Sequence, residues 1–289
     1  MAKVMVFRKL FTCLVVVLLT IPAWAKDLSP PPQRPHLLVD ISNGKVLSGE
    51  LETARWAPAS LTKMMTAYTV FRALELQHLE MNSPVRISEH ALSQPPTKMG
   101  FPIGTILTIE TALKIILVKS ANDVSVALAE SVGGSEDNFV QLMNSHARRL
   151  GMTDSQFTNP HGLHDGMQFT SAYDMARLTI GLTKEFPQYA DFFDIPAVRV
   201  GRRRLRNHNA LVRLFEGTTG MKTGYVCASG YNVVVRTTRN DRTLVAVIMG
   251  AKGGLSRNVD AAMLLTDGFA GKFDGSKREY IPRLSLIHI

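Results

Sequence analysis

The spacing of apolar residues along the chain changes from alternating to helical and then back to alternating. A short apolar run over residues 36–41 predicts a strand, and Asn43-Gly44 after it favours a type I′ hairpin turn into a second strand. Helical spacing, with apolar residues every three or four positions, follows in residues 60–76, 108–132, 136–150 and 171–183. Alternation then predicts strands over residues 198–200, 205–211, 231–237 and 244–249, and a last helix is predicted over residues 256–269.

This order of elements predicts a mixed α/β (α+β) domain over residues 36–270. Strands at both ends of such a chain close by packing into one mostly antiparallel sheet, with helices on its faces and a helical lobe beside it. Polar residues interrupt the helical spacing near Ser120, which predicts two helices joined there or one helix that ends there. Residues 82–105 are rich in Pro, Ser and Gly, and long irregular segments of this kind often line a site.

The first 25 residues have the features of a secretory signal peptide, because basic residues precede an apolar run and Ala23-Trp24-Ala25 fits a cleavage site. Cleavage there predicts an exported protein of the periplasm or cell envelope. Residues 26–35, which contain four prolines, are expected to form an extended leader. Residues 271–289 are expected to be a short tail, and its length leaves open a free single-domain protein and a truncated one.

The composition suits one sizeable core, since 45% of the 289 residues are hydrophobic and 20% are charged. The formal net charge of +9 falls to +6 once the three basic residues of the signal peptide are removed. Such a charge keeps an exported protein soluble or favours peripheral contact with the membrane or with anionic envelope polymers. The five arginines within residues 199–206 are expected in an exposed hairpin. Nucleic acid is not an expected partner, because the chain is exported and its basic residues are not interleaved with aromatic ones.

The pair Ser60 and Lys63 is the first candidate for chemistry. At the start of a helix this spacing places both side chains on one face, one turn apart, so that an amine can take the proton of a hydroxyl nucleophile. Ser42 and Lys45 have the same spacing, but they flank a predicted turn between strands, where a three-residue offset points side chains to opposite faces. The lysine can act as a base only when it is neutral, so its pKa must be lowered by burial and by a second cation, for which Lys222 is the candidate.

Two further motifs follow in order, Ser120-Ala121-Asn122 and Lys222-Thr223-Gly224. With Ser60 and Lys63 behind a signal peptide, they make the chain resemble the penicillin-recognising serine enzymes of the β-lactamase/transpeptidase-like fold. Within that group the chain most resembles the low-molecular-mass D-alanyl-D-alanine carboxypeptidases of peptidase family S11, over about residues 36–269. The segments that carry this closer resemblance are residues 59–66, 120–123, 159–163 and 222–225.

The resemblance implies acyl transfer from peptidoglycan stem peptides that end in D-Ala-D-Ala. Ser60 would be the nucleophile and Lys63 its base, while Ser120 could pass a proton to the leaving amine and the Asn122 amide could bind the peptide backbone. An oxyanion hole made by the backbone N–H groups of Ser60 and Tyr225 is implied by the resemblance alone. β-Lactams are the expected covalent inhibitors.

Other residues are expected to bind substrate. The missing side chain of Gly224 would let a peptide lie along an edge strand just after it, while Thr223 and Lys222 hold the terminal carboxylate. By resemblance, His208 lies where relatives carry polar residues facing the cleft, and Arg257 matches a position that helps to bind carboxylate. No cofactor and no metal are expected, because the two histidines at positions 161 and 164 have no third ligand in view.

Three other functions stay open at this point. A β-lactamase needs fast deacylation, which in one class uses a loop glutamate, yet no glutamate occurs between Glu136 and Glu185. A D,D-endopeptidase acting on cross-links would use the same catalytic groups. A non-catalytic protein that binds stem peptides would need the cleft without turnover at Ser60.

Overall fold

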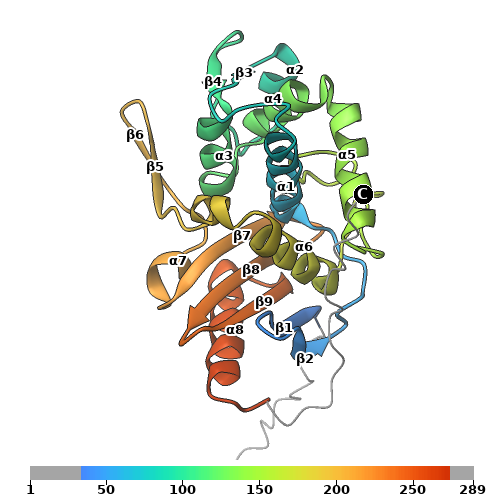
Figure 1. Cartoon of the computed structure of the whole chain (residues 1–289), viewed down its shortest axis with the longest axis vertical. Coiled ribbons are helices and arrows are strands. Elements are labelled where there is room, and N and C mark those ends of the chain that lie inside the picture. Colours follow the sequence, from blue (N-terminus) through green and yellow to red (C-terminus); the bar gives the residue numbers. More distant parts are fainter. Residues whose placement is uncertain (1–33, 274–289) are drawn as a thin grey trace, which may run out of the picture. The chain divides into compact units, whose positions relative to one another are not determined.

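The computed structural model describes residues 34–273 of the chain. The predicted signal peptide, the leader up to residue 33 and the tail from residue 274 lie outside the described residues. Strands from both ends of the described part meet in one antiparallel sheet in the order β2-β1-β9-β8-β7 (Figure 1). These strands are β1 His36–Asp40, β2 Lys45–Glu50, β7 Thr218–Val226, β8 Gly230–Arg239 and β9 Arg242–Ala251. The predicted union of the terminal strands in a mostly antiparallel sheet is therefore confirmed.

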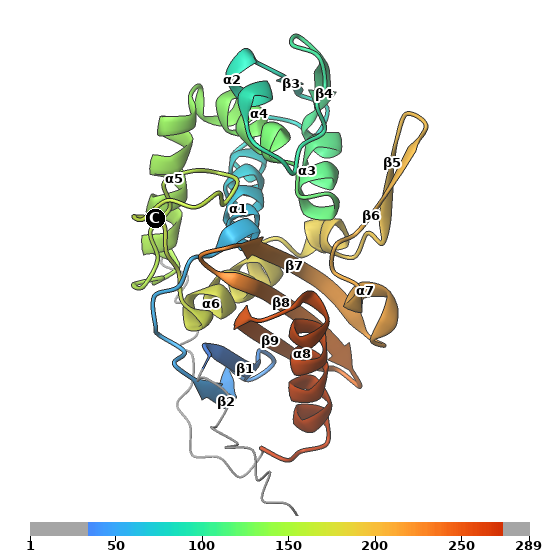
Figure 2. The same cartoon turned by 180° about the vertical axis from the view of Figure 1, so that it is seen from behind.

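Helices cover both faces of this sheet, α6 on one and α8 on the other, as the two opposite views show (Figures 1 and 2). Alternate residues along the strands divide between two apolar clusters. Leu38 and Leu244 pack in the cluster that α8 completes, whereas Leu37 and Val245 belong to the larger core that α6 shares. A Cβ on Gly268 would come within 2.8 Å of methyl groups of both Leu38 and Leu244, so this glycine lets the end of α8 lie against the sheet. The two helices are α6 Ala172–Glu185 and α8 Gly254–Phe269.

The chain between the two groups of strands forms the predicted helical lobe. The side chains of Thr108, Ser135 and Ser171 accept a hydrogen bond from a backbone N–H of the first turn of α3, α5 and α6, which explains where these helices begin. The helical spacing interrupted near Ser120 belongs to two helices, the first of the two predicted arrangements. The helices of the lobe are α1 Thr62–Glu75, α2 Glu89–Ser93, α3 Ile109–Val118, α4 Asn122–Gly133 and α5 Glu136–Arg149.

Two small pairs of antiparallel strands lie outside the main sheet, and the second of them is a hairpin. One pairs β3 with β4, next to the lobe, and the other pairs β5 with β6 and holds the predicted arginine run in an exposed position (Figure 1). None of the described helices is long and apolar enough to cross a membrane. The strands of these two pairs are β3 Pro84–Arg86, β4 Ile106–Thr108, β5 Ala197–Val200 and β6 Arg203–Arg206.

Two sequence predictions about the strands are wrong. The strand predicted over residues 205–211 ends at Arg206, because the side-chain oxygens of Asn207 and Asn209 accept backbone N–H groups two residues ahead and fold the chain into a turn before the short helix α7 Leu211–Leu214. Lys222-Thr223-Gly224 lies within the edge strand β7 and not before it. Apolar alternation did not reveal β7, because Lys222 and Thr223 are polar residues that are nevertheless buried.

Candidate active site

A cavity of about 280 Å³ opens between the edge of the sheet and the helical lobe, and side chains from all three motifs line it. Of the predicted site residues, Lys63, Asn122 and Lys222 are not part of the lining but lie buried beside it. Lys63 contacts Ser60, Lys222 contacts Ser120, and Asn122 contacts Lys63. The structure thus brings together all the residues predicted from the sequence. The lining residues are Ser60, Thr97, Ser120, His208, Thr223, Gly224, Tyr225, Tyr231 and Arg257.

Ser60 lies in the turn of 3-10 helix Ala59–Leu61, directly before α1. Two glycines allow other backbone segments to approach it closely. A Cβ on Gly162 would lie 1.9 Å from the Ala59 oxygen, and a Cβ on Gly224 would lie 3.0 Å from the Ser60 nitrogen. The absent side chain of Gly224 therefore keeps the space around the Ser60 N–H open, which is a different role from the predicted one of admitting a peptide to the strand.

Lys63 is fully buried, and its amine has three polar neighbours. Its Nζ lies 2.8 Å from Asn122 Oδ1, 2.5 Å from the backbone oxygen of His161 and 3.2 Å from Ser60 Oγ. Two of these partners can only accept a hydrogen bond, whereas the serine hydroxyl can donate one. A neutral amine has two N–H groups and one lone pair, so this set of neighbours fits neutral Lys63 with its lone pair directed at the Ser60 hydroxyl.

The electrostatic surroundings favour the same neutral state. Burial lowers the pKa of Lys63 well below its usual value, and the positive charge of Lys222 lowers it further, while the carboxylate of Asp123 opposes the shift. Burial first, and then the charge of Arg257, lowers the pKa of Lys222 to about 7. Lys63 is therefore buried beside a second cation, Lys222, as the lysine-as-base mechanism requires.

Ser120 and Lys222 form a second pair of hydroxyl and amine across the cavity. Lys222 Nζ lies 3.0 Å from Ser120 Oγ and donates a second hydrogen bond to the backbone oxygen of Thr223, also at 3.0 Å. Ser120 has a positive φ of 65° at the junction of α3 and α4. The break between the two helices thus turns the Ser120 hydroxyl toward the edge strand.

Two contributions to the site were not predicted. The buried carboxylate of Asp123 accepts hydrogen bonds from the N–H groups of Met99 and Gly100 at 3.0 and 2.8 Å, which holds the segment whose Thr97 lines the cavity. The ring of Tyr231 lies 4.3 Å from that of Tyr225, because the two residues are opposite each other in the β7–β8 register. The signals in the sequence were an acidic residue directly after Ser-Ala-Asn and a tyrosine one strand away from Lys-Thr-Gly.

The far end of the cavity has positively charged side chains and no carboxylate in its described lining. Arg257 donates to the backbone oxygen of Asn232 at 3.5 Å, and its guanidinium lies 5.9 Å from the centre of the Tyr231 ring. The pKa of His208 is lowered, first by partial burial and then by the charges of Lys222 and other cations, so its ring is uncharged near neutral pH. No aspartate or glutamate is among the described residues that line the cavity, so this end suits an anionic group of a ligand.

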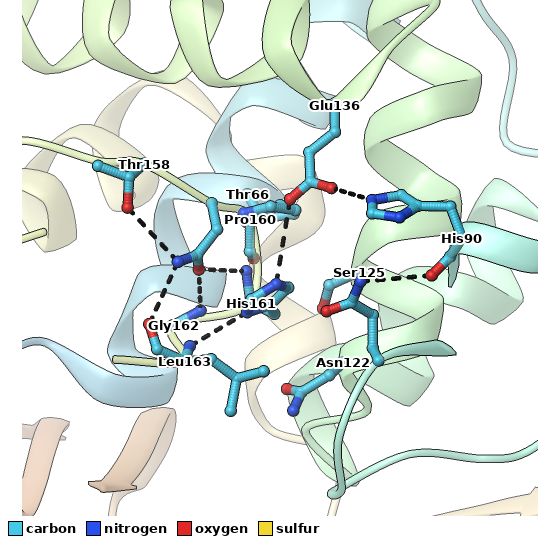
Figure 3. A network of polar contacts seen from close by, with 12 residues as sticks. Thr66, His90, Asn122, Ser125, Glu136, Thr158, Pro160, His161, Gly162 and Leu163 are labelled. Carbon is cyan, nitrogen blue, oxygen red and sulfur yellow. Dashed lines mark hydrogen bonds and ion pairs between the residues drawn. The ribbon is translucent and has the colours of Figure 1, made fainter. Parts of the chain in front are cut away.

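The loop that supplies the His161 oxygen is held by its own side chains and by Thr66 of α1 (Figure 3). Asn159 Oδ1 accepts the N–H of Gly162 at 2.7 Å, and Thr66 Oγ1 donates to the Pro160 oxygen at 2.6 Å. The His161 ring accepts the N–H of Leu163 at 3.1 Å, and burial lowers the pKa of His161 to about 3. This histidine therefore packs the loop, and the described residues contain no group of three side chains suited to hold a metal ion.

Comparison with known proteins agrees with the fold and with the motifs. A family model described as Peptidase_S11, D-alanyl-D-alanine carboxypeptidase, matches residues 33–253. The carboxypeptidase DacF of Bacillus subtilis is 34% identical over 240 residues, which are 81% of this chain and 61% of that protein. DacA of Haemophilus influenzae is 34% identical over 250 residues, which are 83% of this chain and 63% of that protein. This chain thus spans about three fifths of the length of these curated relatives.

A solved structure shares the architecture. Penicillin-binding protein 5 of Haemophilus influenzae superposes with a TM-score of 0.80 at 32% identity, over 84% of this chain and 73% of that one. The predicted β-lactamase/transpeptidase-like fold, an antiparallel sheet flanked by helices with a helical lobe, is thereby confirmed. Because the family model covers most of the chain and these relatives match along it, the chain belongs to the peptidase S11 family of D-alanyl-D-alanine carboxypeptidases.

Proposed function

We propose that the protein is a serine-type D-alanyl-D-alanine carboxypeptidase that removes the terminal D-alanine from peptidoglycan stem pentapeptides through an acyl-Ser60 intermediate. The observation that carries this proposal is the set of neighbours around the Lys63 amine, two acceptors and the Ser60 hydroxyl, in a buried place that favours the neutral amine. The similarity to two D-alanyl-D-alanine carboxypeptidases and to a penicillin-binding protein supports the same reaction.

Binding would use the open edge of β7. The substrate peptide adds to this strand, and its terminal carboxylate lies beside Thr223 and Arg257, with the amine of Lys222 buried behind them. Asn122 lies behind the cavity wall, where its oxygen accepts a hydrogen bond from Lys63. Tyr225 and His208 line the same cavity and contact the terminal residues. The lack of carboxylates in the described lining favours this anionic end of the peptide.

Catalysis would then follow in two steps, acylation of Ser60 and hydrolysis of the acyl-enzyme. Lys63 takes the proton of the Ser60 hydroxyl while Oγ attacks the peptide carbonyl, and the N–H groups of Ser60 and Tyr225 stabilise the oxyanion. The C–N bond breaks as the leaving nitrogen receives a proton through Ser120, which is hydrogen-bonded to Lys222, and D-alanine departs. Water then attacks the acyl-enzyme ester and gives one proton to Lys222 through Ser120. As the ester C–O bond breaks, Lys63 returns its proton to Ser60 Oγ, so the serine hydroxyl and both amines regain their starting states.

β-Lactams would acylate Ser60 and remain bound. No carboxylate of the described residues lies in the cavity wall to activate a deacylating water, so this geometry favours slow hydrolysis over β-lactamase activity. Rapid and repeated hydrolysis of nitrocefin by the purified protein would contradict this. The predicted signal peptide would direct the protein to the periplasm or cell envelope.

Mass spectrometry of the chain without residues 1–25, wild type beside Ser60→Ala, tests the proposal. Wild type should gain the mass of one penicillin and should release D-alanine from a D-Ala-D-Ala pentapeptide, whereas Ser60→Ala should do neither. Release of D-alanine by Ser60→Ala would rule out the acyl-Ser60 route. Cleavage of a cross-linked dimer with no action on the pentapeptide would identify an endopeptidase, and binding of both peptides without turnover would identify a stem-peptide-binding protein.

A further inference from the structure

The hairpin of β5 and β6 carries a dense positive charge that nothing in the described chain neutralises. All five of its arginines are exposed, and within residues 34–273 none of their guanidinium groups makes an ion pair or a hydrogen bond. The nearest acidic residues in the sequence are Asp194 before the hairpin and Glu216 after it. The five are Arg199, Arg202, Arg203, Arg204 and Arg206.

The strand register separates the two faces of this hairpin. Val198 is opposite Leu205, and Val200 and Leu205 pack against the main core, so this face is turned toward the body of the protein. Arg199 is directly opposite Arg204, and Arg206 lies on the same side two residues further along. We call these three residues the arginine face. Like charges directly opposite each other destabilise a strand pair, and an external anion would remove that repulsion.

An exposed apolar turn lies at the same end of the described unit. Ile103 and Ile106, on the turn that enters β4, are 59% and 56% exposed. Backbone hydrogen bonds from Gly104 N to Ile87 O at 2.8 Å and from Ile87 N to Thr105 O at 2.9 Å fix the turn, so the two isoleucines are held away from the core. In both views the turn and the tip of the hairpin project at neighbouring corners of the described unit (Figures 1 and 2).

We propose that the arginine face and the isoleucine turn together form a docking surface for an anionic phospholipid bilayer. Guanidinium groups bind phosphate in bidentate fashion, and a basic cluster beside exposed apolar residues is the combination that holds proteins at the membrane interface. The arginines would contact the headgroup phosphates, while Ile103 and Ile106 enter the boundary with the acyl chains. This inference does not depend on the proposed peptidase activity.

The apolar turn favours a bilayer over a soluble anionic polymer. A polymer of carboxylates or sugar phosphates could neutralise the arginines, but it offers no apolar region to receive two exposed isoleucines. A bilayer satisfies both features with one flat partner. A projecting hairpin also reaches such a surface more easily than residues recessed in a pocket would.

Co-sedimentation with vesicles tests the proposal, using residues 26–289, which include all the residues that the structure describes. Vesicles of phosphatidylcholine with about a quarter phosphatidylglycerol should bind the protein, vesicles of phosphatidylcholine alone should bind it far more weakly, and added salt should weaken binding. The variant Arg199→Gln/Arg204→Gln/Arg206→Gln should lose roughly 100-fold in affinity. Ile103→Ser/Ile106→Ser should lose about tenfold or more.

A charge-matched control separates the arginine face from net charge. Arg148→Gln/Lys184→Gln/Lys252→Gln removes three exposed cations elsewhere on the protein and should change affinity by less than about threefold. Each variant's thermal unfolding midpoint shows whether it is folded. Equal losses in the control, equal binding to both vesicle types, or arginine-dependent binding to isolated peptidoglycan without binding to vesicles would each overturn the proposal.

Discussion

The amine of Lys63 shows how a buried side chain can be prepared for proton transfer by its neighbours alone. Burial removes the water that would stabilise the charged form, and Lys222 adds a like charge nearby. Asn122 and His161 offer only acceptors to the amine, so a neutral Lys63 that donates to both has its lone pair left for the Ser60 hydroxyl. The same residue would be a solvated surface lysine if only its own helix were present.

Replacing Lys222 should move the pH dependence of acylation. In Lys222→Met the charge that lowers the pKa of Lys63 is gone, so this pKa rises and the neutral fraction of Lys63 appears at higher pH. The rising acid limb of the penicillin acylation rate should therefore shift to higher pH, in addition to a loss of about 100-fold or more in rate. Stopped-flow or gel-based labelling with a fluorescent penicillin measures the limb. Lys222→Arg, which keeps the charge, should leave the limb near its original position, and an unmoved limb in Lys222→Met would refute the coupling.

Among the elements, the junction of α3 and α4 does most to assemble the cavity. It ends one helix, places Ser120 at a positive φ and starts the next helix with Asn122 and Asp123. The first turn of α4 thereby contacts Lys63 through Asn122 and the segment around Thr97 through Asp123. This junction therefore supplies the contact between Asn122 and Lys63 and the two hydrogen bonds that Asp123 accepts from Met99 and Gly100.

The carboxylate of Asp123 should be required for that assembly. Asp123→Asn loses acceptors for the buried N–H groups of Met99 and Gly100, so we expect a loss of about 1–3 kcal/mol in the free energy of unfolding and slower acylation. Asp137→Asn is a matched control, because Asp137 has the same position in the first turn of α5 but is exposed. Chemical denaturation of both variants measures the difference, and equal stabilities would show that the buried carboxylate does not hold the segment.

For the molecule as a whole, two buried amines make stability depend on pH. The folded-state pKa values of Lys63 and Lys222 lie below the usual value of 10.5, so between those values and about 10 the unfolded chain binds more protons than the folded one. The burial of these amines therefore costs most at low pH. Its cost falls as the pH rises through the folded-state pKa values toward 10.5.

The free energy of unfolding should accordingly rise from about pH 7 to about pH 10, by at most about 1.4 kcal/mol per pH unit for each amine. In Lys222→Met only Lys63 remains, so the slope should become shallower. Lys184→Met, which removes an exposed lysine, should leave the slope unchanged. Urea unfolding at several pH values measures it, and identical slopes in wild type and Lys222→Met would contradict the lowered pKa of Lys222.

Much of the fold could be predicted from the sequence, because apolar spacing and capping residues act locally. The helices of the lobe other than α2, the strand pair at the start and the last helix follow from spacing, and α3, α5 and α6 begin at Ser or Thr caps. The short helix α2 lies in a segment that was predicted to be irregular. The strand β7 and the turn at Asn207 did not follow from spacing. In both places polar side chains are buried or bonded to the backbone, which reverses the usual relation between polarity and exposure.

The family and a set of candidate site residues could be inferred from the sequence alone, since short motifs in a fixed order are specific even when each is common. What those residues can do depends on the folded structure. The lowered pKa of Lys63 arises from burial and from Lys222, which is 159 positions away in the chain, and the role of Gly224 depends on the backbone of Ser60 that packs against it. Electrostatic and steric effects of this kind act through space at a few ångströms, so they exist only once the chain has folded.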